Sequence, residues 1–380
     1  MKKRFLSVAL AAAVAMSATA CTSNPAESKT TAAPAETKAE ETTAAEASSE
    51  GEKKEAAADG DLITVGYAQV GAESDWRTAN TESFKSTFTE ENGYKLIFDD
   101  AQQKQENQIK AIRSFIQQEV DYIVLAPVTE TGWDTVLQEA KDAGIPVIIV
   151  DRMVDVKDDS LYTAWVGSNF ELEGKKAAAY LDAYMKAKNM KDMKLVNIQG
   201  TIGASAQIGR TKGLDDAVAA NGWNLLDKTT GEFTQAKGQE VMQSFLKKYK
   251  KDFLKSYDDI DVVICENDNE AFGAIDAIKA AGYEVGADKD MMVFSFDSTK
   301  EGLKKVQSGE ITLNTECNPL HGPRVEAIIK QLENKETPEK KAYVDEEMFA
   351  HDDTVKSVTV DGKEYPVTVV TDEVMGARKY

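Results

Sequence analysis

The chain has 380 residues and a formal net charge of −20 at pH 7, from 65 acidic and 45 basic side chains. This excess of negative charge makes nucleic acid and anionic membrane surfaces poor partners for the folded part. With only two histidines and no closely spaced pair of cysteines, the sequence predicts neither a metal site built from those residues nor a His-dependent catalytic triad. We also expect no cofactor.

The first residues predict export. A basic start at residues 2–4 precedes an apolar run at residues 5–16, which is too short to span a bilayer, and small residues then lead to Cys21. This pattern is typical of a bacterial lipoprotein signal peptide over residues 1–21, after which Cys21 is the lipidated first residue. Ala18 departs from the usual pattern, which has Leu at that position. The alternative is an ordinary secretion signal cut elsewhere, and in both cases the mature chain lies outside the cytoplasm.

Residues 22–60 contain no Leu, Ile, Val, Met or aromatic residue. A segment of this composition has almost nothing to bury against the entropy of ordering its backbone. We therefore expect a disordered tether with a typical end-to-end distance of about 35 Å. Such a tether would keep a folded domain close to a membrane that carries the lipid anchor.

The remaining residues, 61–380, exceed what one compact core usually serves, so the sequence predicts two domains. In the first half, short apolar runs alternate with segments of helical periodicity. Near-continuous apolar runs are typical of strands covered on both faces of a parallel sheet. We expect strands at 62–69, 94–98, 121–126 and 146–150, and helices at 75–91 and 103–118.

The same alternation resumes after about residue 190, where we expect strands at 195–199, 223–226, 262–265, 291–296 and 311–315. A β-hairpin follows, with arms at 354–360 and 363–370 around the tight turn Asp361-Gly362. The predicted fold class is therefore α/β, with two doubly wound parallel-sheet lobes in succession.

Each half contains an apolar strand that ends in an aspartate, Asp151 in the first and Asp297 in the second. In open α/β sheets, ligands bind beyond the carboxyl ends of the strands, so both aspartates are well placed to face a ligand. A single such residue would more often cap the following turn or helix. Their matching places in the two halves favour a cleft shared by both lobes.

Further polar and aromatic residues stand at comparable loop and helix-start positions. Trp76 could lie flat on the C–H face of a sugar, although ordinary packing is the alternative. Individually the charged residues are more often surface ion pairs. Together, guanidinium groups and carboxylates around one cleft suit a neutral polyhydroxylated ligand, because each hydroxyl can donate to a carboxylate and accept from an arginine. These charged residues are Glu73, Arg77, Asp151, Arg152, Arg210, Asp297 and Glu316.

Several longer strings carry a specific resemblance. They are QVGAESDWR at 69–77, QQKQENQIKAIRSF at 102–115, APVTETGW at 126–133, Asp151-Arg152, QGTIGAS at 199–205 and GEFT at 231–234. From about residue 62 to the end, the chain resembles the sugar-binding proteins of bacterial ABC importers, in the ribose/galactose-type family. The agreement is best with the galactofuranose-binding members of that family.

The resemblance implies a type I periplasmic binding protein fold, in which two lobes are joined by a three-strand hinge. We expect an N-terminal lobe of residues 61–167 plus 317–345 and a C-terminal lobe of residues 168–316 plus 346–380. Asp151 and Arg152 look like the ligand-gripping pair of the family. Arg210, Asn267 and Asp297 look like polar contacts of the second lobe, and Trp76 and Phe233 look like the aromatic residues on either side of the ring.

Three positions depart from the pattern of ribose binders. Glu316 stands where those proteins usually carry Gln, Arg77 replaces a second aromatic residue, and Ala126 replaces an Asn. These differences argue against ribose and agree with a galactofuranose-like or galactose-like ligand. Cys265 lies in an apolar run and is expected to be buried, with a disulfide to Cys317 as the less favoured alternative.

The sequence thus predicts an extracytoplasmic, lipid-anchored monomer that captures a monosaccharide and delivers it to an ABC permease and its ATPase. A sensor subunit that signals to a membrane histidine kinase or chemoreceptor is the alternative, because fold and ligand do not dictate the partner. A glycoside hydrolase would need two carboxylates flanking a scissile bond, whereas the resemblance places the carboxylates beside arginines as sugar contacts. We therefore expect no enzymatic activity.

Overall fold

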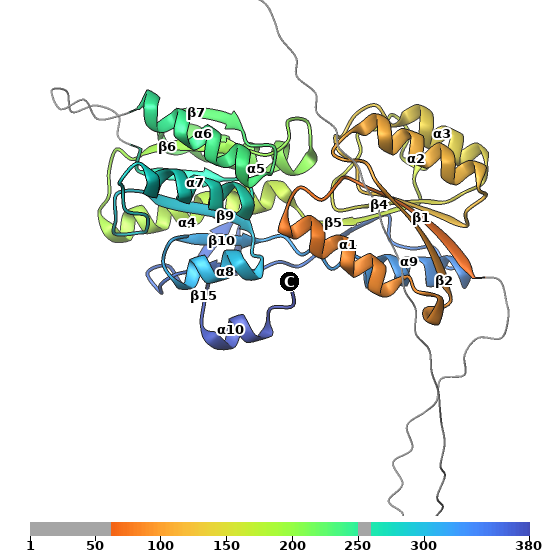
Figure 1. The fold of residues 1–380 in the computed structure, drawn as a ribbon. Helices are drawn as coiled ribbons and strands as arrows, with labels where there is room; N and C mark the ends of the chain where they lie inside the picture. Colours follow the sequence, from red (N-terminus) through yellow and green to blue (C-terminus); the bar gives the residue numbers. More distant parts are fainter. Residues whose placement is uncertain (1–61, 250–259) are drawn as a thin grey trace, which may run out of the picture. The chain divides into compact units, whose positions relative to one another are not determined.

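The computed structural model describes residues 62–249 and 260–380. The predicted signal peptide, Cys21 and the predicted tether therefore lie outside the described residues. The described residues belong to one compact unit that contains two main β-sheets and one small hairpin (Figure 1).

The first sheet is wholly parallel. Its strands are β11 (Lys341–Tyr343), β5 (Ala164–Gly167), β4 (Val147–Val150), β3 (Tyr122–Leu125), β1 (Ile63–Gln69) and β2 (Tyr94–Asp100), in that order across the sheet. Its helices are α1 (Asp75–Thr87), α2 (Gln105–Gln117), α3 (Asp134–Asp142) and α9 (Gly322–Glu333). We call this sheet and its helices the N-lobe.

The second sheet is mostly parallel. Its strands are β15 (Thr368–Val369), β12 (Met348–Ala350), β10 (Leu313–Glu316), β9 (Met292–Asp297), β8 (Val262–Cys265), β6 (Lys194–Gln199) and β7 (Asn224–Thr230), and only the β10–β12 pair is antiparallel. Its helices are α4 (Phe170–Lys188), α5 (Ser205–Asn221), α6 (Gln235–Lys248), α7 (Asp268–Ala280), α8 (Lys300–Gln307) and α10 (Asp372–Ala377). We call this second group the C-lobe.

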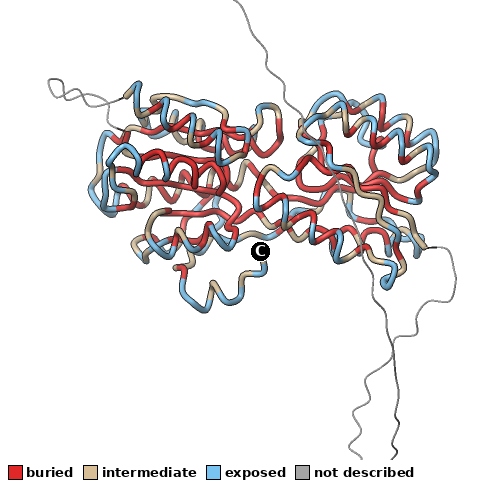
Figure 2. Tube along the Cα trace, viewed as in Figure 1, coloured by how far each residue is buried: buried red, intermediate tan, exposed pale blue. Residues whose placement is uncertain are grey.

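Apolar cores cover both faces of each sheet, which explains why the strands read as continuous apolar runs. In the N-lobe, one core contains Phe84 of α1 and Val325 of α9, and the other contains Ile112 of α2 and Leu137 of α3. In the C-lobe, α6, α7 and α8 pack on one face, while α4, α5 and the hairpin pack on the other. Figure 2 shows the buried strands between more exposed helices. The predicted α/β fold with two doubly wound lobes is confirmed.

The chain changes sheets at three places. β5 of the N-lobe is followed by α4 of the C-lobe, β10 of the C-lobe by α9 of the N-lobe, and β11 of the N-lobe by β12 of the C-lobe. The three intervening stretches, residues 168–169, 317–321 and 344–347, are called the crossing segments below.

Two predicted elements differ from the structure. The predicted helix 75–91 ends at Thr87, because Thr89 accepts a hydrogen bond from the Asn92 backbone N–H and begins a separate 3₁₀ turn, η1 (Glu90–Asn92). A second 3₁₀ turn, η2 (Asp159–Leu161), precedes β5. The predicted hairpin forms as β13 (Ser357–Val360) and β14 (Lys363–Pro366), but the residues after Pro366 leave it and join the second sheet as β15.

Close contact between α4 and α5 depends on small residues. A Cβ atom at Gly174 would lie 2.5 Å from the Arg210 carbonyl oxygen, and one at Gly213 would lie 2.5 Å from the Lys175 backbone nitrogen. The two helices can therefore approach only because these side chains are absent. This contact sets the position of Arg210, which proves important below.

We predict that Gly174→Ala lowers the free energy of unfolding by about 1–3 kcal/mol, because the added methyl group must push α5 away from α4. Denaturant unfolding of the purified protein measures this change. Gly376→Ala is the control, since a Cβ there would meet no atom within 4 Å in the described part of the chain. Equal stabilities of the two variants would contradict the account of the α4–α5 contact.

Candidate functional site

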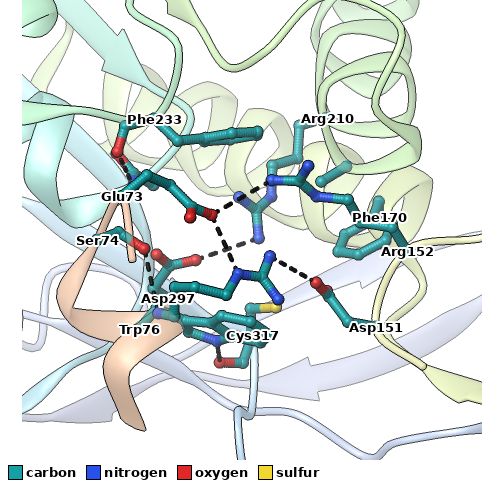
Figure 3. Close-up of a pocket in the computed structure, with 13 residues that line it drawn as sticks. Glu73, Ser74, Trp76, Asp151, Arg152, Phe170, Arg210, Phe233, Asp297 and Cys317 are labelled. Atoms are coloured by element: carbon teal, nitrogen blue, oxygen red, sulfur yellow. Dashed lines mark hydrogen bonds and ion pairs between the residues drawn. The ribbon is translucent and has the colours of Figure 1, made fainter. Parts of the chain in front are cut away.

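A pocket of about 290 Å³, partly open to solvent, lies where both lobes and a crossing segment meet. Its walls come from the carboxyl ends of strands and the starts of helices in both lobes, as expected for open α/β sheets. The lining residues are Glu73, Ser74, Trp76, Arg77, Asp151, Arg152, Phe170, Ala206, Arg210, Phe233, Asn267, Asp297 and Cys317 (Figure 3).

Every residue predicted to bind a ligand lines this pocket, with the exception of Glu316. Glu316 ends β10, and its carboxylate accepts hydrogen bonds from Arg378 Nη1 at 2.6 Å, from the Tyr380 hydroxyl at 2.5 Å and from the Glu347 backbone N–H at 2.9 Å. Successive side chains of an extended strand point to opposite sides, so the next residue, Cys317, faces the pocket in its place. Glu316 therefore does not line the pocket, contrary to the prediction.

Sequence reasoning also missed Ser74, Phe170 and Ala206. Ser74 accepts a hydrogen bond from the Arg77 backbone N–H and caps α1, and Phe170 is the first residue of α4. Both stand at helix starts that follow a strand end or a crossing segment. That position was the only signal that could have identified them.

The N-lobe side of the pocket is organised around Arg77. Its guanidinium lies 2.8 Å from Asp151 Oδ2 and 3.0 Å from Glu73 Oε1, and it donates to Gln69 Oε1 at 3.2 Å. Although burial alone would lower the pKa of Arg77, the neighbouring Asp151 and Glu73 carboxylates raise it above its ordinary value. Arg77 therefore stays charged and holds both carboxylates in place.

Arg152 is the second guanidinium of this side. It donates to the Val128 carbonyl oxygen at 3.0 Å and lies 3.8 Å from Glu73 Oε1. Burial, together with the positive charge of Arg77, lowers the pKa of Arg152 to about 10. Arg152 is thus less completely paired than Arg77, which leaves part of its fork for a ligand.

The C-lobe side is organised around Arg210 of α5. Its Nε lies 2.7 Å from Glu173 Oε2, its Nη2 lies 3.4 Å from Asp297 Oδ1, and its Nη1 donates to the Glu266 carbonyl oxygen. The carboxylates of Glu173 and Asp297 raise the pKa of Arg210 against the opposing effect of burial. Burial raises the pKa of Asp297 well above its ordinary value, although Arg210 acts in the opposite direction.

Each pocket arginine also lies over an aromatic ring. The guanidinium carbon is 4.6 Å from the ring centre of Trp76 for Arg77, 5.0 Å from that of Phe233 for Arg152, and 5.4 Å from that of Phe170 for Arg210. Such stacking fixes the plane of a guanidinium fork. Trp76 is itself held by a hydrogen bond from its Nε1 to the Cys317 carbonyl oxygen at 2.6 Å.

Three pocket residues have left-handed backbones, with φ of 60° at Asp151, 62° at Phe233 and 97° at Asp297. This conformation is costly for residues other than glycine and tends to persist where a side chain must be aimed at a site. Gly200 makes room for one of them, since a Cβ there would lie 1.9 Å from Phe233 Cζ. Asn267 fixes the same loop by donating to the Phe233 carbonyl oxygen at 3.0 Å and by capping α7.

The charged groups that line the pocket are three arginines and three carboxylates, so their formal charges cancel. The three arginines are between 2 and 3% exposed. Among the described residues, Glu73 Oε2 is buried and has no hydrogen-bond donor. A neutral ligand with several hydroxyl groups could use this acceptor and the free edges of the arginines without adding net charge.

The two lobes also touch around the pocket. The Asp75 backbone N–H donates to Asn269 Oδ1 at 3.0 Å, the Met153 backbone N–H donates to Ser205 Oγ at 2.9 Å, and the Glu130 backbone N–H donates to the Gly203 carbonyl oxygen at 2.9 Å. These contacts join residues of opposite lobes. The structure is therefore a closed arrangement, in which the lobes meet over the pocket.

Two further sequence expectations concern the cysteines and the membrane. Cys265 and Cys317 are both buried and both free, so the disulfide alternative is wrong. None of the helices in residues 62–249 and 260–380 combines the length and apolar character that crossing a membrane requires.

The chain belongs to the periplasmic binding protein family, since the model of the periplasmic binding protein domain matches residues 65–316. It is 44% identical over 280 residues to the galactofuranose-binding protein YtfQ of Escherichia coli K12, an alignment that covers 73% of this chain and 85% of that protein. The family and this relative are solute-binding proteins and not enzymes, so the hydrolase alternative is set aside.

Two solved structures are similar to the fold described above. One is a Mycobacterium smegmatis protein in complex with β-D-fucofuranose, with a TM-score of 0.71, 41% identity and coverage of 77% of this chain and 93% of that chain. The other is the periplasmic binding protein of the arabinose ABC transporter from Shewanella sp. ANA-3, bound to α- and β-L-arabinofuranose. Its TM-score is 0.69, with 41% identity and coverage of 77% of this chain and 93% of that chain.

A buried histidine supports the N-lobe wall. His321 Nδ1 lies 3.0 Å from Asn80 Nδ2, and its ring packs edge-on to Trp76 with 6.0 Å between ring centres. Its Nε2 has no partner in the described part of the chain. Burial lowers the pKa of His321 to about 4, so the folded protein holds this ring neutral.

We predict that the burial of neutral His321 makes the free energy of unfolding decrease as the pH falls below about 6.5. Between the ordinary histidine pKa of 6.5 and the folded value of about 4, the unfolded chain binds the proton more tightly, so stability is lost by up to about 3 kcal/mol over that range. His321→Gln should reduce this acid dependence in unfolding titrations, whereas His351→Gln, at the chain's other histidine, should not. Identical pH profiles for the wild type and His321→Gln would contradict the prediction.

Proposed function

We propose that this protein binds a neutral monosaccharide in the pocket between its lobes, and that the sugar is a furanose of the galactofuranose type. The observation that carries the proposal is the balance of three arginines against three carboxylates, all with buried side chains, beside aromatic rings. A charged ligand would leave one sign uncompensated in a buried place, which is costly. A sugar adds no charge and can both donate to the carboxylates and accept from the guanidinium groups.

The aromatic residues support the same class of ligand. In the view of Figure 3, Phe233 and Trp76 lie on opposite sides of the charged groups. A sugar ring between them would bury its C–H faces against the aromatic rings and keep its hydroxyls at the edge, next to Asp151 and Arg210. This division of apolar faces and polar edges is the property that a carbohydrate pocket requires.

The ring form is proposed from the relatives. YtfQ is named for galactofuranose, and the two solved structures hold fucofuranose and arabinofuranose. These sugars share the configuration of their ring carbons and differ in the exocyclic chain. We infer that the residues around the ring are similar in this pocket, and that the exocyclic chain decides between the three sugars.

We further propose that the loaded protein delivers its sugar to an ABC permease and its ATPase. The relative from Shewanella is named as a component of an ABC transporter, which supports this partner over a kinase or chemoreceptor. Closing would be driven by ligand contacts that both lobes make only in the closed form. We also propose that the protein acts as a monomer.

We predict that Asp151→Ala and Arg210→Ala each weaken sugar binding by roughly 100-fold or more, because each removes a charged hydrogen-bonding group from one lobe. Isothermal titration calorimetry with L-arabinose, D-galactose and D-fucose measures the affinity, and D-ribose and D-glucose are the sugars expected not to bind. The furanose form is a minor fraction of each free sugar, so the apparent dissociation constant is the dissociation constant of the furanose form divided by that fraction. Arg113→Ala is the control, since Arg113 pairs with Glu139 at the surface. Retained affinity in both pocket variants would overturn the proposed site.

The lipid anchor is a separate proposal. Cys21 follows an export signal and precedes a segment that has nothing to bury, which is the arrangement of a tethered lipoprotein. We predict that Cys21→Ser moves the protein from the membrane fraction to the soluble fraction of the cells and abolishes its labelling with radioactive palmitate. A soluble, unlabelled wild-type protein would show that the signal is an ordinary secretion signal.

A further inference from the structure

The three crossing segments are tied together by one carboxylate. Glu346 Oε1, in the third segment, accepts from the Ser168 hydroxyl of the first segment at 2.5 Å and from the Asn318 backbone N–H of the second segment at 2.8 Å. Ser168 Oγ also lies 3.3 Å from Cys317 Sγ. A movement of one lobe relative to the other must change the geometry of these segments, so it must also change this junction.

A second carboxylate lies against this junction. One carboxylate oxygen of Glu173, one of Glu346 and the Sγ atom of Cys317 all lie within 4.8 Å of one another. Glu173 Oε2 is paired with Arg210, but Glu173 Oε1 is buried and has no donor among the described residues. Two carboxylates this close, one of which has a buried oxygen without a donor, repel each other unless they share a proton or bind a cation.

The surroundings favour a proton over a cation. Arg210 already lies 2.7 Å from Glu173, and Lys176 Nζ donates to the Glu346 carbonyl oxygen at 3.0 Å. These two positive charges would repel a divalent ion in the same place, whereas a proton held between two carboxyl groups removes their mutual repulsion. Two further acidic groups act on the cluster, Glu316 on Glu346 and Asp297 on Cys317, while Lys363 acts on Lys176.

We propose that Glu173 and Glu346 share one proton in the closed form, and that closing the lobes on the sugar takes this proton up. The inference rests on the proposed function. Cys317 joins the junction to the pocket, because its side chain lines the pocket while its carbonyl oxygen holds Trp76. Glu173 makes the second link, because it positions Arg210.

The electrostatics agree with this geometry. Burial raises the pKa of Glu173, and burial together with the nearby Glu173 raises the pKa of Glu346 well above its ordinary value. If the closed form holds the proton more tightly than the open form, its stability relative to the open form falls as the pH rises from the ordinary pKa to the raised pKa. Sugar affinity should therefore decrease with rising pH, by up to about tenfold per pH unit for one linked proton.

Calorimetry on the full chain with L-arabinose tests this inference. Titrations at one pH in buffers of different ionisation enthalpy count the protons taken up on binding, and titrations from about pH 5 to about pH 9 follow the dissociation constant. We expect uptake approaching one proton for the wild type. Other buried acids with raised pKa values, Glu266 among them, can also contribute to the proton uptake and pH dependence of the wild type. A variant is therefore needed to show that the proton belongs to Glu173 and Glu346.

Glu346→Gln is that variant, because the amide keeps an acceptor for Ser168 and Asn318 and donates to Glu173 without titrating. We expect it to lose both the proton uptake and the pH dependence. Glu347→Gln, the same change at the exposed neighbouring residue, should retain both. If Glu346→Gln does not fold, Glu173→Gln carries the same test.

The outcomes separate the two levels of the proposal. Sugar binding with no proton uptake, or uptake that persists in Glu346→Gln, would overturn the shared proton and leave the binding function intact. One equivalent of a divalent metal in the purified protein, with affinity lost on chelation, would also overturn it, because a cation then occupies the cluster. If L-arabinose does not bind, the same titrations are made with D-galactose and D-fucose, and no binding of any of the three sugars at any pH would instead refute the proposed function.

Discussion

The pairing of buried guanidinium groups with buried carboxylates is the interaction on which the site depends. A charge taken out of water is costly unless it is closely paired and hydrogen-bonded. Arg77 meets this condition through Asp151 and Glu73, and Arg210 meets it through Glu173 and Asp297. The charged residues that line the pocket, namely these two arginines with Arg152 and the carboxylates of Glu73, Asp151 and Asp297, have formal charges that cancel. The lining can therefore keep a rigid set of charged donors and acceptors without a formal net charge, which is the environment that a neutral polyhydroxylated ligand needs.

The fold supplies these pairs at a small number of positions. Strand ends deliver Asp151 and Asp297, and their left-handed backbones aim both side chains at the pocket. Small residues allow the close packing behind them: Gly174 admits α5 against α4, and Gly200 admits the Phe233 ring. The crossing segments then connect the two lobes, and one of them, residues 317–321, contributes Cys317 to the pocket lining.

The sequence predicts the parts of this arrangement that depend on local pattern. The apolar runs identified the strands, and the aspartates at strand ends pointed to the interlobe pocket, because parallel strands place their carboxyl ends at one edge. Glu316 was misplaced because a shift of one residue along a strand reverses the side that a side chain faces. The roles of Glu173, Cys317 and Glu346 could not be predicted, since they depend on contacts between distant segments that no local spacing records.

A crystal structure of the protein grown with L-arabinose tests the central claim most directly. The account predicts one sugar in its five-membered ring form in the interlobe pocket, with its faces against Trp76 and Phe233 and its hydroxyls bonded to Asp151 and Arg210. A sugar bound elsewhere, or held in this pocket without contact to the arginines and carboxylates, would contradict it.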